Sequence, residues 1–181
     1  QNAGRADVMV LSTDTLIYGG LVDSRKHNIP LSTLQNRLKR IEGLKARNKN
    51  VRIYGFGTVM RSPRASGGGT EPAYYAEYGP TIFQIAALQD KLDSGSLTQE
   101  ETQKLMSLQA SVPVEYLQDW FDRRQKNMKI NKELIDETRS GVFDYFALGH
   151  DDTSQLSQSA LEGRYLNKYS KDISVEKYGS F

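Results

Sequence analysis

The chain has 181 residues, of which 38% are hydrophobic and 25% charged, as expected for one sizeable globular domain. With 24 basic and 22 acidic residues its net charge is only +2, so no strong field favours nucleic acid or an anionic membrane as a partner. Cysteine is absent, which excludes disulfides, thiolate nucleophiles and thiolate metal sites but leaves the redox compartment open.

Sequence signals for membrane insertion and secretion do not determine where the protein is located. No apolar run reaches the roughly 18 residues that a membrane span needs, so we expect no spanning helix. The start of the chain also lacks a basic and apolar signal sequence. Because the chain begins with Gln1, this does not decide between a cytoplasmic and a secreted protein.

Three apolar runs have the length and composition of buried β-strands, at residues 7–12, 51–60 and 142–148. The first is typical of strands that are covered on both faces. A helix is predicted between the first two, because apolar residues recur at spacings of three and four. They are Leu31, Leu34, Leu38, Ile41 and Leu44. A strand, a helix and a strand in this order predict a right-handed βαβ unit with parallel strands.

Ser32 and Gln35 have the spacing of a capping box at the start of this first helix. Between the second and third strands, residues 61–141 are predicted to form a helical insertion. It begins with a loop over the strand edge at 61–70, whose glycines at 67–69 lack the lysine and hydroxyl residue of a Walker phosphate loop. Helices are expected at 82–92, at 97–108 with a Thr98 and Glu101 capping box, and at 113–141.

The last of these helices is the longest, and two stripes are visible on it. Its apolar face is predicted from Val114, Leu117, Phe121, Met128 and Ile135. A basic stripe consists of Arg123, Arg124, Lys126, Lys129 and Lys132. Such a stripe is typical of a solvated face, and a grip on phosphate or nucleic acid is the alternative.

Together these elements predict the α/β class, with parallel strands and βαβ crossovers in a (β/α)-barrel-like or doubly wound sheet. Residues 1–181 would be a single α/β domain or part of one. A further helix is expected at 157–170, and 173–181 looks like the approach to a strand that the chain does not complete. An incomplete sheet has open edges, so we expect self-association or pairing with the rest of the same polypeptide.

Polar residues follow each predicted strand. Asp14 follows the first, Arg61 the second, and the third ends in Gly149, His150, Asp151 and Asp152. Ligands of parallel α/β folds bind at this carboxyl edge. Because neighbouring side chains on an extended backbone point to opposite faces, we expect one aspartate of the pair 151–152 to face a pocket while the other caps the following helix.

Five stretches in this order resemble the bacterial family known as domain of unknown function 4127. They are DTLIYGGLVDSR (14–25), VMR (59–61), EPAYYAEYG (71–79), DRRQKN (122–127) and LGHDD (148–152). The family has no settled activity, so the resemblance implies organisation and not function. Its members are longer and continue into an acidic motif, which implies that this chain is an internal piece. Members carry a neutral amide where His150 stands, which counts against an essential role for that histidine.

The leading functional hypothesis is a carbohydrate-active hydrolase of the glycosidase type. Asp14, Asp151 and Asp152 are the candidate catalytic residues, because paired carboxylates in different environments can act as acid and base. By analogy of fold, the adjacent aspartates are similar to those of retaining glycosidases that use the substrate's own amide as nucleophile. The candidate residues for binding a small-molecule or carbohydrate substrate are Arg61, Arg25, Glu71, Tyr74 and His150.

Each of these residues also has a structural interpretation. Arg25 and Arg61 could clamp a carboxylate, a phosphate or sugar hydroxyls, or could pair with Asp14 and Glu71. Tyr74 could stack on a sugar or pack between helices.

Two other functional classes stay open, a non-catalytic ligand-binding or structural domain and a metal-dependent hydrolase. The latter would use His150, Asp152 and Asp14, but no His-x-x-x-His or comparable spacing supports it, so neither a metal nor a cofactor is assigned.

Overall fold

The computed structural model describes residues 6–65, 69–152 and 154–181. The strands are β1 (Val8–Ser12), β2 (Arg52–Val59), β3 (Tyr145–His150) and β4 (Gly179–Ser180). The helices are α1 (Thr13–Tyr18), α2 (Leu31–Arg47), α3 (Tyr75–Asp93), α4 (Gln99–Ser111), α5 (Val114–Arg139) and α6 (Gln158–Asp172), with two short 3-10 turns, η2 (Asp23–Arg25) and η3 (Glu176–Tyr178). The predicted α/β class is therefore confirmed. Of the expected loop at 61–70, residues 66–68 lie outside the described part.

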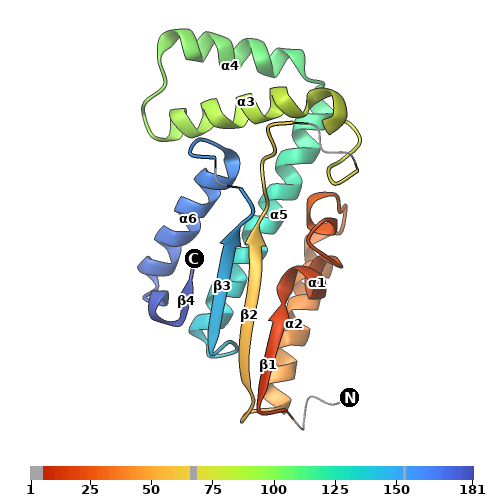
Figure 1. Cartoon of the computed structure of the whole chain (residues 1–181), viewed down its shortest axis with the longest axis vertical. Coiled ribbons are helices and arrows are strands. Elements are labelled where there is room, and N and C mark those ends of the chain that lie inside the picture. The colour runs from red at the N-terminus through yellow and green to blue at the C-terminus, as the bar shows by residue number, and fades with distance from the viewer. Residues whose placement is uncertain (1–5, 66–68, 153) are drawn as a thin grey trace.

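The four strands form one parallel sheet in the order β1-β2-β3-β4. Val8 lies opposite Arg52, Tyr54 opposite Tyr145, and Phe146 opposite Gly179, so the predicted parallel pairing is confirmed. Helices α2 and α5 lie behind the strands (Figure 1). This order without reversal is that of a segment of a (β/α) barrel or of one half of a doubly wound sheet, and the sheet is not closed.

The main core lies between this sheet and its crossover helices. In β2 the buried positions alternate with partly or fully exposed ones, which places Ile53 and Val59 on the covered face. They pack with Leu34 of α2, Leu134 of α5 and Leu166 of α6 in one cluster. The sheet is thus fixed from one side by three helices.

The other face of the sheet is uncovered in the described structure. Val8 is 40% exposed, Val10 68%, Phe56 47% and Tyr145 41%. The expectation that the first strand is covered on both faces is wrong for the described residues. The reason is topological, because successive right-handed crossovers in one direction put every crossover helix on the same face.

Helices α3 and α4 form a second cluster with the first half of α5. Tyr75, Ile82, Leu105 and Trp120 are buried together there, away from the sheet. Helix α4 begins with the predicted capping box, in which the Glu101 amide donates to Thr98 Oγ1 at 3.2 Å and the Thr98 amide to Glu101 Oε2 at 3.1 Å. Helix α5 belongs to both clusters, since its second half packs against the sheet. A boundary of the insertion at 61–141 stays a prediction.

The capping box predicted at Ser32 does not form. Helix α2 begins at Leu31, directly after Pro30, and has no side-chain cap. Ser32 therefore lies inside the first turn, too late to serve as the N-cap. Gln35 instead donates from Nε2 to Glu133 Oε1 of α5 at 2.6 Å.

The predicted apolar face of α5 is only partly confirmed in its first half, where Leu117 and Phe121 pack partly buried against the second cluster. Val114 is 74% exposed, whereas Trp120, Arg123 and Arg124 are buried. The buried stripe is rotated by about one position relative to the prediction and includes two residues of the basic stripe that was expected to be solvated. The polar character of those residues predicts exposure, and the ion-pair partner of Arg124, Glu162, lies 38 residues further along the chain.

None of the described helices combines the length and apolar character that a membrane crossing requires.

Candidate functional site

The carboxyl end of β1 runs directly into α1, which brings Asp14 to the strand edge. Ser12 is the N-cap residue of α1, and Thr13 Oγ1 donates to the Phe56 carbonyl at 3.0 Å. A Cβ at Gly57 would come within 2.4 Å of Thr13 Oγ1, so α1 can lie this close to β2 only because residue 57 is glycine. Asp14 is thereby held at the seam between two strand ends.

The Asp14 carboxylate is buried beside a hydroxyl. Thr58, at the end of β2, donates to Asp14 Oδ2 at 3.0 Å. Burial raises the pKa of Asp14, and the nearby negative charge of Asp151 raises it further, while the hydrogen bonds from Thr58 and the charge of Arg25 act in the opposite direction. Asp14 thus has a greater tendency to hold a proton than an exposed aspartate.

Two arginines and two further carboxylates lie at the same strand edge as Asp14. Arg25, which follows the turn after α1, forms an ion pair from Nη2 with Asp151 Oδ2, and its Nη1 lies 3.6 Å from Glu71 Oε1. Arg61 donates from Nε to the same Glu71 oxygen at 2.9 Å. We call Asp14, Arg25, Arg61, Glu71 and Asp151 the strand-end cluster. Residues that are remote in sequence thus meet at the carboxyl edge.

The strand-end cluster contains two buried polar atoms without a partner among the described residues. They are Arg25 Nε and Glu71 Oε2, on side chains that are only 5% and 1% exposed. Burial also raises the pKa of Glu71, against the lowering effect of Arg61 and Arg25. A buried donor and a buried acceptor left unsatisfied are costly in a fold, and such atoms call for water or a ligand.

Asp152 lies beside the strand-end cluster and holds two loops together. Its Oδ2 accepts the Ser62 amide at 3.2 Å and its Oδ1 accepts the Ser154 amide at 2.8 Å. The N-cap of α6 is Ser157, not an aspartate, so the expectation that one of the pair caps the next helix is wrong. Asp151 and Asp152 do have different surroundings, because one meets Arg25 and the other meets backbone amides.

His150 and Tyr74 lie apart from the contacts of the strand-end cluster. The His150 ring packs over Gly163 of α6, where an added Cβ would come within 1.9 Å of Cε1. The Tyr74 ring stacks on Tyr116 at 4.8 Å, and its hydroxyl donates to Asp119 Oδ2 at 2.7 Å. Both rings are therefore engaged in packing, and a binding role for either stays a prediction.

No group of three or more His, Asp or Glu side chains within the described ranges is placed to hold a metal ion. In particular, His150 packs on α6 while Asp152 binds backbone amides. The residues named for a metal-dependent hydrolase are thus not brought together there.

Sequence analysis missed Arg124, which is buried at the base of the β2 end. Its Nε and Nη2 each donate to a different oxygen of Glu162 at 2.7 Å. The same guanidinium donates to the carbonyls of Met60 at 2.6 Å and Arg61 at 2.9 Å. Because Arg61 belongs to the strand-end cluster, Arg124 fixes the backbone of a candidate binding residue.

Asn127 and Arg123 do the same for the segment that carries Arg25. Asn127 donates from Nδ2 to the Ser24 carbonyl at 2.9 Å, and Arg123 from Nε to the His27 carbonyl at 2.9 Å. The His27 ring bonds Asn127 Oδ1 at 2.8 Å. The burial of these polar residues could have been recognised from helical periodicity. Residues 120, 123, 127, 130 and 134 fall on one face of the helix, and the residues at both ends of this face are apolar.

Comparison with known proteins now adds the family. The model of a family described as a protein of unknown function, DUF4127, matches residues 1–181. The chain belongs to this family. The resemblance carried by the five sequence stretches is confirmed, and the description of DUF4127 names no activity. No curated protein and no solved structure matches the chain.

Proposed function

We propose that the strand-end cluster is the acid and base centre of a hydrolase that acts on glycosides. Asp14 would donate the proton to the leaving group, and Asp151 would act as the ionised carboxylate, either as nucleophile or as base. The observation that carries the proposal is the contrast between two aspartates at one strand edge. One is buried against a hydroxyl with a raised pKa, and the other is ion-paired with a buried arginine.

Asp152 has a different part in this proposal from the one that its position in the sequence predicts. Both of its oxygens are engaged by backbone amides, so it would position Asp151 and would not react. The acid and base pair then comes from two strand ends, and the mechanism that uses adjacent aspartates with a substrate amide is not favoured.

The two unpartnered atoms support a hydroxyl-rich substrate. A sugar hydroxyl both donates and accepts, so it can satisfy Arg25 Nε as an acceptor and Glu71 Oε2 as a donor. A carboxylate or a fully ionised phosphate group could accept from the arginine but has no proton to donate to the glutamate. Arg61, whose side chain is 27% exposed, would contribute the outer contact to the same substrate.

The test is a panel of aryl glycosides and aryl phosphates with the natural protein that carries this sequence. We expect glycoside turnover that Asp14→Asn and Asp151→Asn each lower by roughly 10²- to 10⁴-fold. Asp172→Asn, on the exposed end of α6, is the matched control and should leave turnover unchanged.

The leaving group separates the two roles. Dinitrophenyl glycosides need no protonation, so they should restore turnover to Asp14→Asn but not to Asp151→Asn. Equal losses with both leaving groups, or turnover of phosphates alone, would refute the assignment.

A specific observation favours a second candidate, a non-catalytic binding or structural domain. Glu71 and Asp151 both pair with Arg25, as expected if the carboxylates only fix the loops. In that case Asp151→Asn would lower the free energy of unfolding, and no member of the panel would be turned over.

A further inference from the structure

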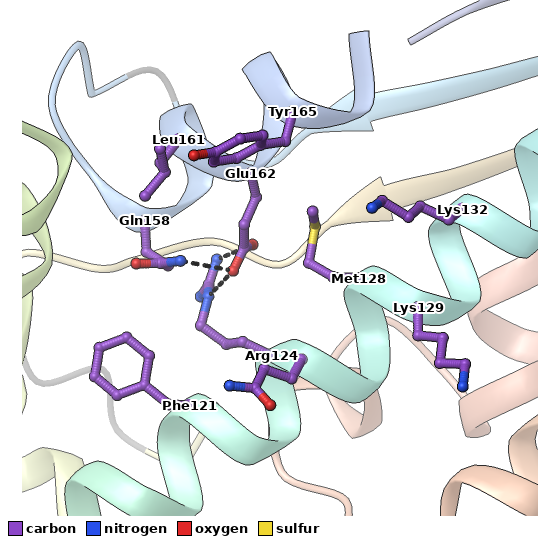
Figure 2. Close-up of a pocket in the computed structure, with 10 residues that line it drawn as sticks. Phe121, Arg124, Met128, Lys129, Lys132, Gln158, Leu161, Glu162 and Tyr165 are labelled. Carbon is purple, nitrogen blue, oxygen red and sulfur yellow. Dashed lines mark hydrogen bonds and ion pairs between the residues drawn. The ribbon is translucent and has the colours of Figure 1, made fainter. Parts of the chain in front are cut away.

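Among the described pockets, the one with the most apolar lining lies between α5 and α6, away from the strand-end cluster. Its volume is about 430 Å³, within the range of small-molecule sites. Figure 2 shows Leu161 and Tyr165 of α6 facing Phe121 and Met128 of α5 across it. Phe121 and Met128 belong to the apolar stripe that the sequence predicts as core, yet here they line an open pocket.

The floor of this pocket is polar but internally satisfied. Arg124 and Glu162 meet there through two hydrogen bonds, and Gln158 Nε2 adds a third to Glu162 Oε1 at 3.2 Å (Figure 2). Arg124 also donates to the carbonyls of Met60 and Arg61 and to Ser159 Oγ at 3.5 Å. The floor therefore offers a ligand little unmet hydrogen bonding, and the attraction of the pocket comes from its apolar walls.

The surplus charge of the pocket comes from two lysines. Lys129 and Lys132 line it beyond Met128 along α5, and both are exposed. Neither forms an ion pair with any described residue, and Lys132 Nζ lies 5.3 Å from the centroid of the Tyr169 ring. Since the Arg124 and Glu162 charges cancel, the lining residues carry a net charge of about +2 at one end of an apolar pocket.

We propose that this pocket binds an amphipathic anion, with an apolar aliphatic or aromatic body against Phe121, Met128 and Leu161 and an anionic head against Lys129 and Lys132. Charge and apolar walls are arranged in sequence along α5, so the head and body of the ligand must have the same order. Sugars and other neutral polyols do not fit, because the polar floor is already engaged.

Binding should be visible in the single tryptophan of the chain. The centroid of the Trp120 ring lies 4.9 Å from the centroid of the Phe121 ring and 4.8 Å from the guanidinium carbon of Arg124. Both Phe121 and Arg124 line the pocket. Decanoate is a suitable aliphatic probe, anilinonaphthalene sulfonate is an aromatic one, and decanol supplies the same chain without the charge. Titration of Trp120 fluorescence, with calorimetry as a second measurement, gives the affinities.

We expect decanoate to bind at least tenfold more tightly than decanol and to displace the sulfonate. The double variant Lys129→Gln/Lys132→Gln should weaken decanoate binding by roughly five- to twentyfold and leave decanol binding unchanged. Its matched control is Lys49→Gln/Lys104→Gln, which removes two exposed lysines elsewhere. Leu161→Asp should weaken the binding of both decanoate and decanol. Leu92→Asp, on the exposed side of α3, should weaken the binding of neither.

Thermal unfolding of each variant checks that it is folded, and the lysine pair decides the result even if Leu161→Asp unfolds. Equal binding of decanoate and decanol by the unaltered protein would overturn the proposal. So would unchanged decanoate affinity in Lys129→Gln/Lys132→Gln, or the absence of binding by either anionic probe.

Discussion

Removal of Arg124 should be among the most damaging single changes in the chain. The change Arg124→Met keeps most of the side-chain volume but leaves the Glu162 carboxylate buried without its partner, and breaking such a buried pair costs about 3–5 kcal/mol. The Arg124 and Glu162 side chains are only 1% and 6% exposed, so water does little to compensate. A domain is stable by about 5–15 kcal/mol, so roughly a fifth or more of the stability would be lost.

A double-mutant cycle tests the origin of this loss. In Arg124→Met/Glu162→Met no charge remains buried, but the carbonyls of Met60 and Arg61 still lack their donor, which leaves a residual loss of about 2 kcal/mol. Glu162→Met alone leaves the Arg124 charge buried and should also destabilise the protein, so the two single losses together should exceed the loss of the double variant by more than about 2 kcal/mol. Urea unfolding followed by circular dichroism measures all four proteins. A loss below about 1 kcal/mol for Arg124→Met, or a coupling energy near zero, would refute the view that this ion pair is buried and essential.

Three further predictions concern a glycine of β2, the buried His27 and the cap of α4. Gly57→Ala should lower the free energy of unfolding by about 1–3 kcal/mol, because its Cβ clashes with Thr13. Gly149→Ala is the control, since its Cβ meets nothing closer than 3.9 Å, and should change the free energy of unfolding by less than about 0.5 kcal/mol. Comparable urea midpoints for the two variants would contradict this prediction. Burial lowers the pKa of His27, so the folded state resists protonation and stability should fall as pH drops from about 6.5 toward the folded pKa. That pH dependence should be smaller in His27→Gln than in His150→Gln, which removes the other histidine, and equal slopes would rule it out. Thr98→Ala, which removes the capping box of α4, should cost about 0.5–2 kcal/mol, and an unchanged thermal midpoint would show that α4 does not depend on its cap.

The strands and their direction could be predicted because the relevant signals are local. Each is a short apolar run that ends at a polar residue or a glycine, and a helix between two strands leaves only a parallel arrangement. The carboxyl ends of parallel strands meet at one edge, which is why Asp14 and Asp151 were expected to lie near each other. Arg25, Arg61 and Glu71 followed from their positions in the loops at that edge.

The side of the sheet on which His150 lies could also have been predicted. Phe146, Leu148 and His150 occupy alternate positions of β3, so their side chains point to the face that packs on the helices, where the exposed His150 ring contacts Gly163. Sequence analysis placed all residues after Leu148 at the carboxyl edge of the sheet. It did not use the alternation of side chains between the two faces of a strand. The packing of Tyr74 could not be predicted for another reason, since the contacts of its ring depend on a helix that begins about 40 residues later.

The buried polar stripe of α5 could not be predicted from local sequence. Burial of an arginine is favourable only when a carboxylate meets it, and the partner of Arg124 lies 38 residues further along the chain. A basic stripe with a distant partner and a solvated basic stripe have the same composition. Only the apolar residues that share its face, Trp120, Ile130 and Leu134, distinguish the two, and they must be weighed against a competing stripe that includes Phe121 and Met128.

Helix α5 therefore determines where the candidate binding residues stand. Its side chains hold the Ser24 carbonyl beside Arg25 and the carbonyl of Arg61 itself. Backbone carbonyls fixed from a buried helix are more rigid than carbonyls of a loop in water, because each bond is made in a medium of low dielectric constant and is costly to break. Arg25 and Arg61 thus project from loops that a single helix anchors. This anchoring explains how charged side chains can be held in fixed positions at the carboxyl edge of a sheet whose strands are short.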